Sequence, residues 1–288
     1  MRAAAAVAVL LLAAGCGGGD EAAESAATFT GAPLELQDPG AVHVHGLGYD
    51  SAAGVLYIAT HTGLFELPDG AAEPTRIGDS HQDTMGFALV EPGYFLGSGH
   101  PDARENLPPH LGLIRSTDDG RTWEPVSLGG EADFHVLRAR GKHVFGFDAT
   151  GERLLASSDG GRTWTPLQAP ENLLDLAVDP GDPNHLVGAG GAVLYETTNR
   201  GRSWRAAASG TSGSLAWPAP GRLYLATADG AFLAATSAAG PWRARTALGA
   251  PVAALHAAGP ELLFAALHEG TIKRSDDGGR AWTVRTSP

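Results

Sequence analysis

The sequence has little of three things: cysteine, basic residues and long apolar runs. Its single cysteine is Cys16, so the chain cannot form an internal disulfide and its stability has to come from a hydrophobic core. Lys and Arg number 20 against 32 Asp and Glu, and the formal charge of -12 argues against nucleic acid or anionic lipid as a partner. No segment after the first fifteen residues is apolar over the roughly 20 residues that a transmembrane helix needs.

The first fifteen residues are arranged like an export signal. One positive charge is followed by an apolar run and then by small residues before Cys16. The stretch LLAAGC resembles the signal of bacterial lipoproteins, in which the cysteine becomes the lipidated first residue of the mature chain. This resemblance implies a signal peptide at 1–15, lipidation of Cys16, and an exported protein anchored on the outer side of the cell membrane. The alternative is a plain secretory signal in which Cys16 is incidental.

The segment after Cys16 has the composition of a linker. Residues 17–40 are rich in Gly and Ala and carry five acidic residues and no basic one, which predicts a flexible tether over 16–40. The remaining residues, 41–288, are enough for one large all-β domain such as a barrel or a propeller.

A repeated octamer sets the architecture. The segments STDDGRTW, SSDGGRTW and SDDGGRAW end at Trp123, Trp164 and Trp282, and weaker copies end at Trp204 and Trp242. The tryptophans are therefore spaced by 41, 40, 38 and 40 residues. A period near 40 is typical of repeated units of about four short strands. Asp or Asn bonding its own backbone, Gly at positive φ and a packed Trp predict a tight hairpin in each unit.

This octamer resembles the Asp-box of sialidases, other propeller glycosidases and several non-enzymatic propellers. In that family the hairpin joins the third and fourth strands of each blade, far from the ligand face, so the resemblance implies a structural role for Asp118, Asp159 and Asp277. Six units can be counted, which predicts a six-bladed β-propeller. Their first strands are expected at 43–50, 83–90, 133–139, 173–179, 212–218 and 251–258, and four of the second strands at 55–60, 94–99, 143–148 and 222–227.

The histidines are unevenly distributed over this plan. In a propeller blade the first strand lines the central channel, so the entry to strand one and the loop from strand two to strand three share one face. Eight of the eleven histidines fall there: His43, His45, His61, His81, His100, His110, His135 and His268. Three go to the opposite face: His143, His185 and His256.

Aligned first strands place His45, Met85 and His135 at equivalent points around the channel, and His43, Asp83 and Asp133 one pleat earlier. Because residues two apart on a strand point the same way, each pair should project into the channel mouth. Imidazoles, carboxylates and a thioether suit a transition metal, zinc or copper, with Met favouring copper. The candidate metal or ligand residues are His43, His45, His61, His81, Met85, His100 and His135. The alternatives are an organic or sugar ligand without metal, and purely structural histidines.

The segments HVHGLGYD, QDTMGF and GSGHPD also resemble bacterial exported Asp-box propellers described as sialidase-like or glycosyl-hydrolase-like. The resemblance implies the fold and leaves enzymatic activity open. The arginine set, the R-I-P signature and a tyrosine–glutamate pair of true sialidases are missing. Another glycosidase would need two carboxyl groups, for which Asp83 and Asp133 are the candidate catalytic residues. A third alternative is a non-enzymatic assembly propeller, similar to photosystem assembly factors, using a partner surface.

Overall fold

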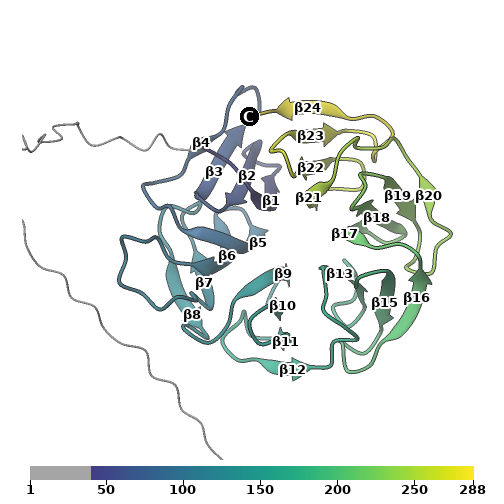
Figure 1. Ribbon diagram of the computed structural model, residues 1–288, viewed down its shortest axis with the longest axis horizontal. Coiled ribbons are helices and arrows are strands. Elements are labelled where there is room, and N and C mark those ends of the chain that lie inside the picture. Colours follow the sequence, from purple (N-terminus) through teal and green to yellow (C-terminus); the bar gives the residue numbers. More distant parts are fainter. Residues whose placement is uncertain (1–39) are drawn as a thin grey trace, which may run out of the picture. The chain divides into compact units, whose positions relative to one another are not determined.

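The computed structural model describes residues 40–288, which form 24 β-strands and no helix. The strands make six antiparallel sheets of four strands each, and in every sheet four consecutive strands pair in chain order. The sheets surround a centre like blades, with the first strand of each innermost and the fourth at the rim (Figure 1). This part of the chain is therefore an all-β, six-bladed β-propeller, which confirms the fold that the 40-residue period predicts.

Each blade is one continuous stretch of chain. Blades 1 and 2 contain β1 (Val44–Asp50), β2 (Val55–Thr60), β3 (Gly63–Pro68), β4 (Thr75–Arg76), and β5 (Asp83–Glu91), β6 (Tyr94–His100), β7 (Leu113–Ser116), β8 (Glu124–Ser127). Blades 3 and 4 contain β9 (Phe134–Arg140), β10 (His143–Asp148), β11 (Arg153–Ser157), β12 (Thr165–Leu167), and β13 (Asp175–Val178), β14 (Leu186–Ala189), β15 (Val193–Thr197), β16 (Arg205–Ser209). Blades 5 and 6 contain β17 (Gly213–Ala219), β18 (Arg222–Thr227), β19 (Phe232–Ala235), β20 (Arg243–Ala244), and β21 (Val252–Ala257), β22 (Leu263–Leu267), β23 (Ile272–Ser275), β24 (Thr283–Thr286).

The predicted strands lie close to the observed ones. All six first strands are found, and their ends differ from the predicted ends by two residues at most. Among the second strands, β2, β10 and β18 match the predicted bounds, and β6 is one residue longer at its end. The predicted signal peptide, Cys16 and all but the last residue of the predicted tether lie outside the described residues. Within residues 40–288, no helix has the length and apolar character needed to cross a membrane.

The hydrophobic core lies between the blades. Six clusters of buried side chains each join two neighbouring blades. Blades 6 and 1 are joined in the same way, with Phe264 of β22 packed among Tyr49, Ile58 and Phe65 of blade 1. No strand crosses from one blade into another, so the ring closes through side-chain packing.

Polar contacts add to this closure. Arg274 Nη1 lies 3.1 Å from Asp69 Oδ1 of blade 1. Arg285, on the last strand, donates hydrogen bonds to the carbonyl oxygens of Pro68 and Ala71. The backbone N–H of Tyr49 donates to His256 Nε2 of blade 6 at 3.1 Å.

The repeated octamers form the turns between the third and fourth strands. In the blade 3 copy, Ser157 Oγ donates to Asp159 Oδ1 at 2.7 Å and accepts from the N–H of Gly161 at 2.9 Å. Asp159 in turn accepts from the N–H and the hydroxyl of Thr163 at 3.0 and 2.7 Å. All four bonds recur around Asp118, and three of them recur around Asp277, where Ala281 has no hydroxyl to donate. These carboxylates are occupied in holding their own turns.

Candidate metal centre at the channel mouth

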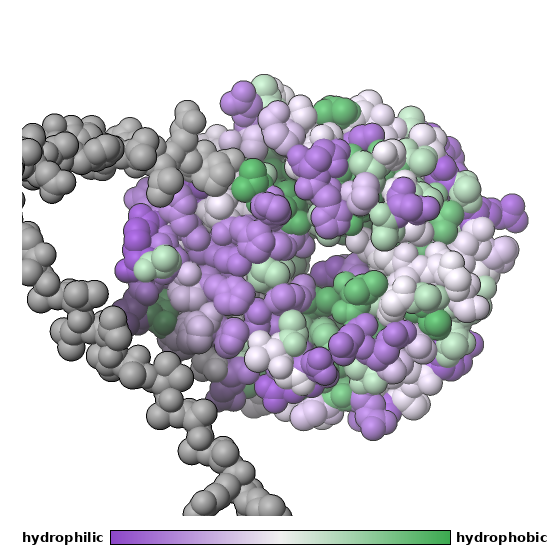
Figure 2. Space-filling model, in the orientation of Figure 1, coloured by the Kyte–Doolittle hydropathy of each residue, from purple (hydrophilic) through white to green (hydrophobic). Residues whose placement is uncertain are grey.

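The six innermost strands surround a channel of about 290 Å³. The channel opens at the centre of the ring, and hydrophilic side chains gather over blades 1 and 2 beside it (Figure 2). His45, Met85 and His135, from the first strands of blades 1, 2 and 3, all line it. The alignment of first strands in the sequence therefore places these three residues around one opening.

A β-bulge occurs at this same point in four blades, and in blade 6 the skipped residue is Ala253, between Val252 and Ala254. Strand pairing skips His45 between Val44 and Gly46, Met85 between Thr84 and Gly86, and His135 between Phe134 and Val136. A bulge bends a strand and re-aims the extra side chain, and bulges are enriched beside functional sites. The side chains at the mouth are thus positioned by an irregularity that interrupts the simple alternation along the strand.

The glycine after the bulge permits close packing of the innermost strands. A Cβ on Gly86 would lie 2.3 Å from the carbonyl oxygen of Phe134 in the next blade, and one on Gly46 would lie 2.8 Å from Cβ of Phe87. Both separations are too short for a side chain. In His45–Gly46 and in Met85–Gly86, the first residue has its side chain re-aimed by the bulge. The glycine after it lets the strand approach the neighbouring blade.

Three donors meet between blades 1 and 2 and form what we call triad A: His45, His61 and Asp83. Their donor atoms lie within 4.8 Å of one another. Asp83 Oδ1 lies 2.9 Å from His61 Nδ1 and 3.7 Å from His45 Nε2. His45 Nε2 and Asp83 Oδ1 are nevertheless buried without a hydrogen bond, because the near His61 nitrogen is not aligned to donate.

A second group, triad B, lies next to it between blades 2 and 3 and contains His100, His110 and Asp133. Its donor atoms also lie within 4.8 Å of one another. Two of them, His110 Nδ1 and Asp133 Oδ1, are again buried without a hydrogen bond. The side chain of Asp133 is only 5% exposed, so its free oxygen has no access to bulk water.

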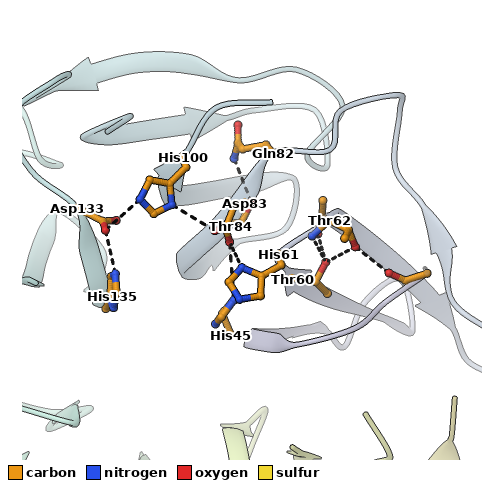
Figure 3. Close-up of polar contacts among 12 residues, drawn as sticks. His45, Thr60, His61, Thr62, Gln82, Asp83, Thr84, His100, Asp133 and His135 are labelled. Carbon is orange, nitrogen blue, oxygen red and sulfur yellow. Dashed lines mark hydrogen bonds and ion pairs between the residues drawn. The ribbon is translucent and has the colours of Figure 1, made fainter. Parts of the chain in front are cut away.

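The two triads are connected through His100 (Figure 3). His100 Nδ1 lies 3.2 Å from Asp83 Oδ2, and its Nε2 lies 3.5 Å from Asp133 Oδ2. His135 Nε2 lies 2.9 Å from the same Asp133 oxygen. Imidazoles and carboxylates therefore alternate across the mouth from blade 1 to blade 3.

The electrostatics favour metal-ligating protonation states. Burial, followed by the charge of His61, lowers the pKa of His45 to about 4, so His45 is neutral near pH 7. Burial alone would raise the pKa of Asp133, but the hydrogen bond with His135 and the nearby imidazoles lower it below its usual value. The same hydrogen bond raises the pKa of His135. The mouth thus offers a neutral imidazole and an ionised carboxylate.

Local hydrogen bonds fix the backbone that carries these groups. Thr60 Oγ1 donates to the carbonyl of Gly63 at 2.8 Å and accepts from the N–H of Thr62 at 3.0 Å, which closes the turn bearing His61. The N–H of Asp133 donates to Asp148 Oδ1 at 3.0 Å. The site is built on strand ends and tight turns, so its geometry is largely preformed.

Four predicted site residues lie outside both triads: His43, His81, Met85 and His135, the last of which lies beside Asp133 of triad B. His43 is exposed and has a φ of 53°, just before β1 begins, so the predicted pleat alternation with His45 does not hold there. Its ring instead lies 5.3 Å from that of His61, centroid to centroid. His81 is exposed, and its backbone N–H donates to Asp102 Oδ2 at 2.8 Å. Met85 lines the channel below the triads.

His110 belongs to the site but was not among the predicted ligands. It lies in the connection between β6 and β7, the longest on this face. Its carbonyl accepts from the N–H of Gly130 at 2.8 Å, and the next N–H, of Leu111, donates to Gly99 at 2.8 Å. Loop length and the shared face were visible in the sequence, but the fold of the loop that turns His110 toward Asp133 was not.

No protein-family model matches the sequence, and no curated protein sequence matches it. Solved structures are similar. A GH74 enzyme from Niastella koreensis has a TM-score of 0.61 and 16% identity, covering 85% of this chain and 45% of that chain, so this chain spans about half its length. YCF48 from Cyanidioschyzon merolae has a TM-score of 0.52 and 14% identity, covering 85% of both chains. YCF48 bound to D1 peptide has a TM-score of 0.53 and 16% identity, covering 86% and 84%. At such identities the likeness is one of fold, and this chain shares its fold with propellers of different functions.

Proposed function

We propose that the propeller binds a transition-metal ion at the channel mouth through His45, His61 and Asp83. The observation that carries this proposal is the pair of buried donor atoms without hydrogen bonds, His45 Nε2 and Asp83 Oδ1, 3.7 Å apart. Buried polar atoms are nearly always paired, and leaving one unpaired costs roughly 1–3 kcal/mol. A cation between these atoms satisfies both.

The donor set narrows the choice of metal. Two imidazole nitrogens and one carboxylate oxygen are typical of zinc sites that keep a position open for water or substrate. The same set also suits iron(II) and copper(II). Met85 lines the same channel as His45 and His135, and its thioether keeps copper among the candidates. Zinc is the first metal to test, and copper is the second.

The test is a titration of the metal-free full chain with Zn²⁺ and with Cu²⁺. Binding is measured by calorimetry and by the shift in melting temperature. We expect at least one tight site per chain and stabilisation that grows with free metal concentration. His45→Ala should weaken the site by more than the roughly 10- to 100-fold that loss of a supporting hydrogen bond costs. His268→Ala, on the same face in blade 6, is the control. Absence of stoichiometric binding would refute the proposal.

Glycoside hydrolysis by Asp83 and Asp133 is the second candidate, favoured by the similarity to GH74 enzymes. The His100 imidazole lies between the two carboxyl groups, 3.2 Å from one and 3.5 Å from the other. A sugar ring placed there would have to displace it. Turnover of aryl glycosides that is lost in Asp83→Asn and Asp133→Asn, without added metal, would favour this alternative.

A non-enzymatic role as an assembly propeller is the third candidate, and it draws on the similarity to YCF48 bound to D1 peptide. The arginines of the octamers, Arg121, Arg162, Arg202 and Arg280, lie on the face opposite the channel mouth and are the candidate contact surface for a partner. Arg121, Arg162 and Arg280 each donate to a carbonyl within their own turn, which holds the guanidinium in place and leaves its other N–H groups for a partner.

The proposed location is the outer side of the cell membrane, with the propeller attached through lipid on Cys16. The support is the arrangement of residues 1–16 in the sequence, together with the Asp-box character of the repeats in exported propellers. Labelling with a radioactive fatty acid should mark the chain and should not mark a Cys16→Ala variant.

A further inference from the structure

A second cluster at the channel mouth carries the same features as triad A. Triad B also offers two imidazole nitrogens and one carboxylate oxygen. In each triad, one nitrogen and one oxygen are buried without a hydrogen bond: His45 Nε2 and Asp83 Oδ1 in triad A, His110 Nδ1 and Asp133 Oδ1 in triad B. These four atoms are a large share of the nine such side-chain atoms in residues 40–288. From this we infer that triad B is a second metal site and that the channel mouth holds a pair of metal ions, an inference that rests on the proposed function of triad A.

Asp133 is oriented to ligate with its free oxygen. Its Oδ2 lies 2.9 Å from His135 Nε2, which is aligned for a hydrogen bond. Its Oδ1 is buried without a hydrogen bond, and the carboxylate groups with His100 and His110, whose donor atoms lie within 4.8 Å of one of its oxygens and of each other. A hydrogen bond to one oxygen of a ligating carboxylate fixes the orientation of the other. His135, predicted as a ligand, is therefore a positioning residue in this centre.

His100 couples the two sites because each of its nitrogens faces one carboxylate. An ionised Asp83 accepts the proton of His100 Nδ1 through Oδ2, 3.2 Å away. That tautomer leaves the lone pair of His100 Nε2 directed toward Asp133 Oδ2, 3.5 Å away. Asp83 thus offers Oδ1 to the ion in triad A (site A). Through Oδ2 it orients His100, a ligand of the ion in triad B (site B).

His110 brings its loop into the centre. Its backbone is held on both sides, by Gly130 and by Gly99, with hydrogen bonds of 2.8 Å. An ion in site B would therefore link this loop to the end of β6 and the start of β9. The loop is also tied to the segment before β5, because the buried Asp102 accepts from the N–H of His81.

The test is the number of Zn²⁺ ions bound per full chain, measured by native mass spectrometry and by metal analysis after dialysis. We expect two ions in the unchanged protein and one in His110→Gln and in Asp133→Asn. His81→Ala, an exposed histidine of the same face outside both triads, should keep two. Melting curves of the metal-free variants show whether each substitution preserves the fold. Asp133→Asn hardly changes the side-chain volume, so it still tests the site if His110→Gln disturbs the packing.

The outcomes separate this inference from the proposed function. One ion per chain, unaffected by His110→Gln and Asp133→Asn, would overturn the second site and leave triad A standing. No ion at all would overturn both. Two ions that survive both substitutions would overturn the assignment of the second site to triad B.

The coupling has its own readout. Asp83→Asn removes a ligand of site A and replaces the acceptor for His100 with an amide that can donate instead. We expect it to lose site A and also to weaken binding at site B by about 10- to 100-fold. His61→Ala removes only a ligand of site A and should weaken site B less. Equal weakening of site B by both substitutions would contradict the role given to His100.

Discussion

At the residue scale, each buried histidine of this domain can be understood by asking which of its nitrogens has a partner. His185 has both occupied, with Nδ1 2.9 Å from Asp179 Oδ2 and Nε2 2.7 Å from Glu196 Oε1. His45 has an unpaired and buried Nε2 beside an equally unpaired carboxylate oxygen. The first arrangement is complete without a ligand, whereas the second is the one that the proposed metal would complete. This difference separates a structural histidine from a candidate ligand better than burial alone.

His256 provides a residue-scale prediction on pH. Burial, followed by the positive charges of Arg138 and Arg140, lowers its pKa from 6.5 to about 4. The unfolded chain therefore takes up a proton before the folded domain does, and the domain loses stability as the pH falls from 6.5 to about 4. The loss from this group alone is at most on the order of 3 kcal/mol. Urea denaturation at pH 7, 5.5 and 4 measures it.

The matched variant for this prediction is His256→Gln. Glutamine can still accept the N–H of Tyr49, which bonds His256 Nε2 at 3.1 Å, but it does not titrate. The variant should lose less stability than the unchanged protein between pH 6.5 and 4. An unchanged slope would show that the titration of His256 does not govern this pH range.

The candidate site could be predicted from the sequence only in part, for a reason that also lies at this scale. Strand alignment found His45 and His135, and loop position found His61 and His100. The pairing of donors depends on bulges and on the backbone of one loop, neither of which leaves a pattern in the sequence. Hence His43, His81, Met85 and His135, all predicted as ligands, lie outside the triads, and His110 of triad B is not among the predicted ligands.

At the scale of elements, the octamer is a turn closed by its own side chains. Its period predicted blades of about forty residues, because the polar residues and Gly of a copy bond one another whatever the rest of the blade contains. The first blade has no octamer, and it was counted from its strand pattern. The weaker copies keep the geometry with other atoms: in blade 4, Thr197 donates to Asn199 at 2.8 Å, and the N–H of Ser203 donates to Asn199 at 3.0 Å. The bulges show the opposite behaviour, since they arise from the packing of neighbouring blades.

The last octamer allows a comparison of two adjacent acids. Asp277 accepts from Ser275 Oγ and from the N–H groups of Arg280 and Ala281, whereas Asp276 is exposed and pairs with Arg274. Asp277→Ala should lower the melting temperature by a few degrees, and Asp276→Ala should change it little although it removes the same charge. Calorimetry of both variants makes the measurement.

This difference should depend on pH. Hydrogen bonds from the Ala281 N–H and from Ser275 lower the pKa of Asp277 below its usual 3.8, although burial opposes them. The carboxylate stabilises the turn above that value, and its contribution is lost as the pH falls through the lower pKa of the folded state. Asp276→Ala and Asp277→Ala should therefore converge in stability in strong acid. A constant difference would mean that the charge of Asp277 is not what holds the turn.

At the scale of the whole ring, the interface between the last blade and the first resembles the other five. Phe264 is fully buried between blades 6 and 1, and Phe145 is fully buried between blades 3 and 4. Replacing either with Ala should cost about 3–5 kcal/mol. Chemical denaturation of the two variants compares them directly. A much smaller loss for Phe264→Ala would identify the closure as a weak point, and faster hydrogen exchange in β1–β4 and β21–β24 would then accompany it.

Because every sheet is encoded by one uninterrupted stretch of about forty residues, a single duplication or deletion of gene sequence would add or remove a whole blade without cutting any sheet. Propellers that share a strand between the first and last blades do not have this freedom, since the shared sheet joins both ends of the coding region. The uneven distribution of site residues among the blades is consistent with a ring that arose by duplication of blades. Blades 1 to 3 carry every residue of the two triads, and blades 4 to 6 carry none of them.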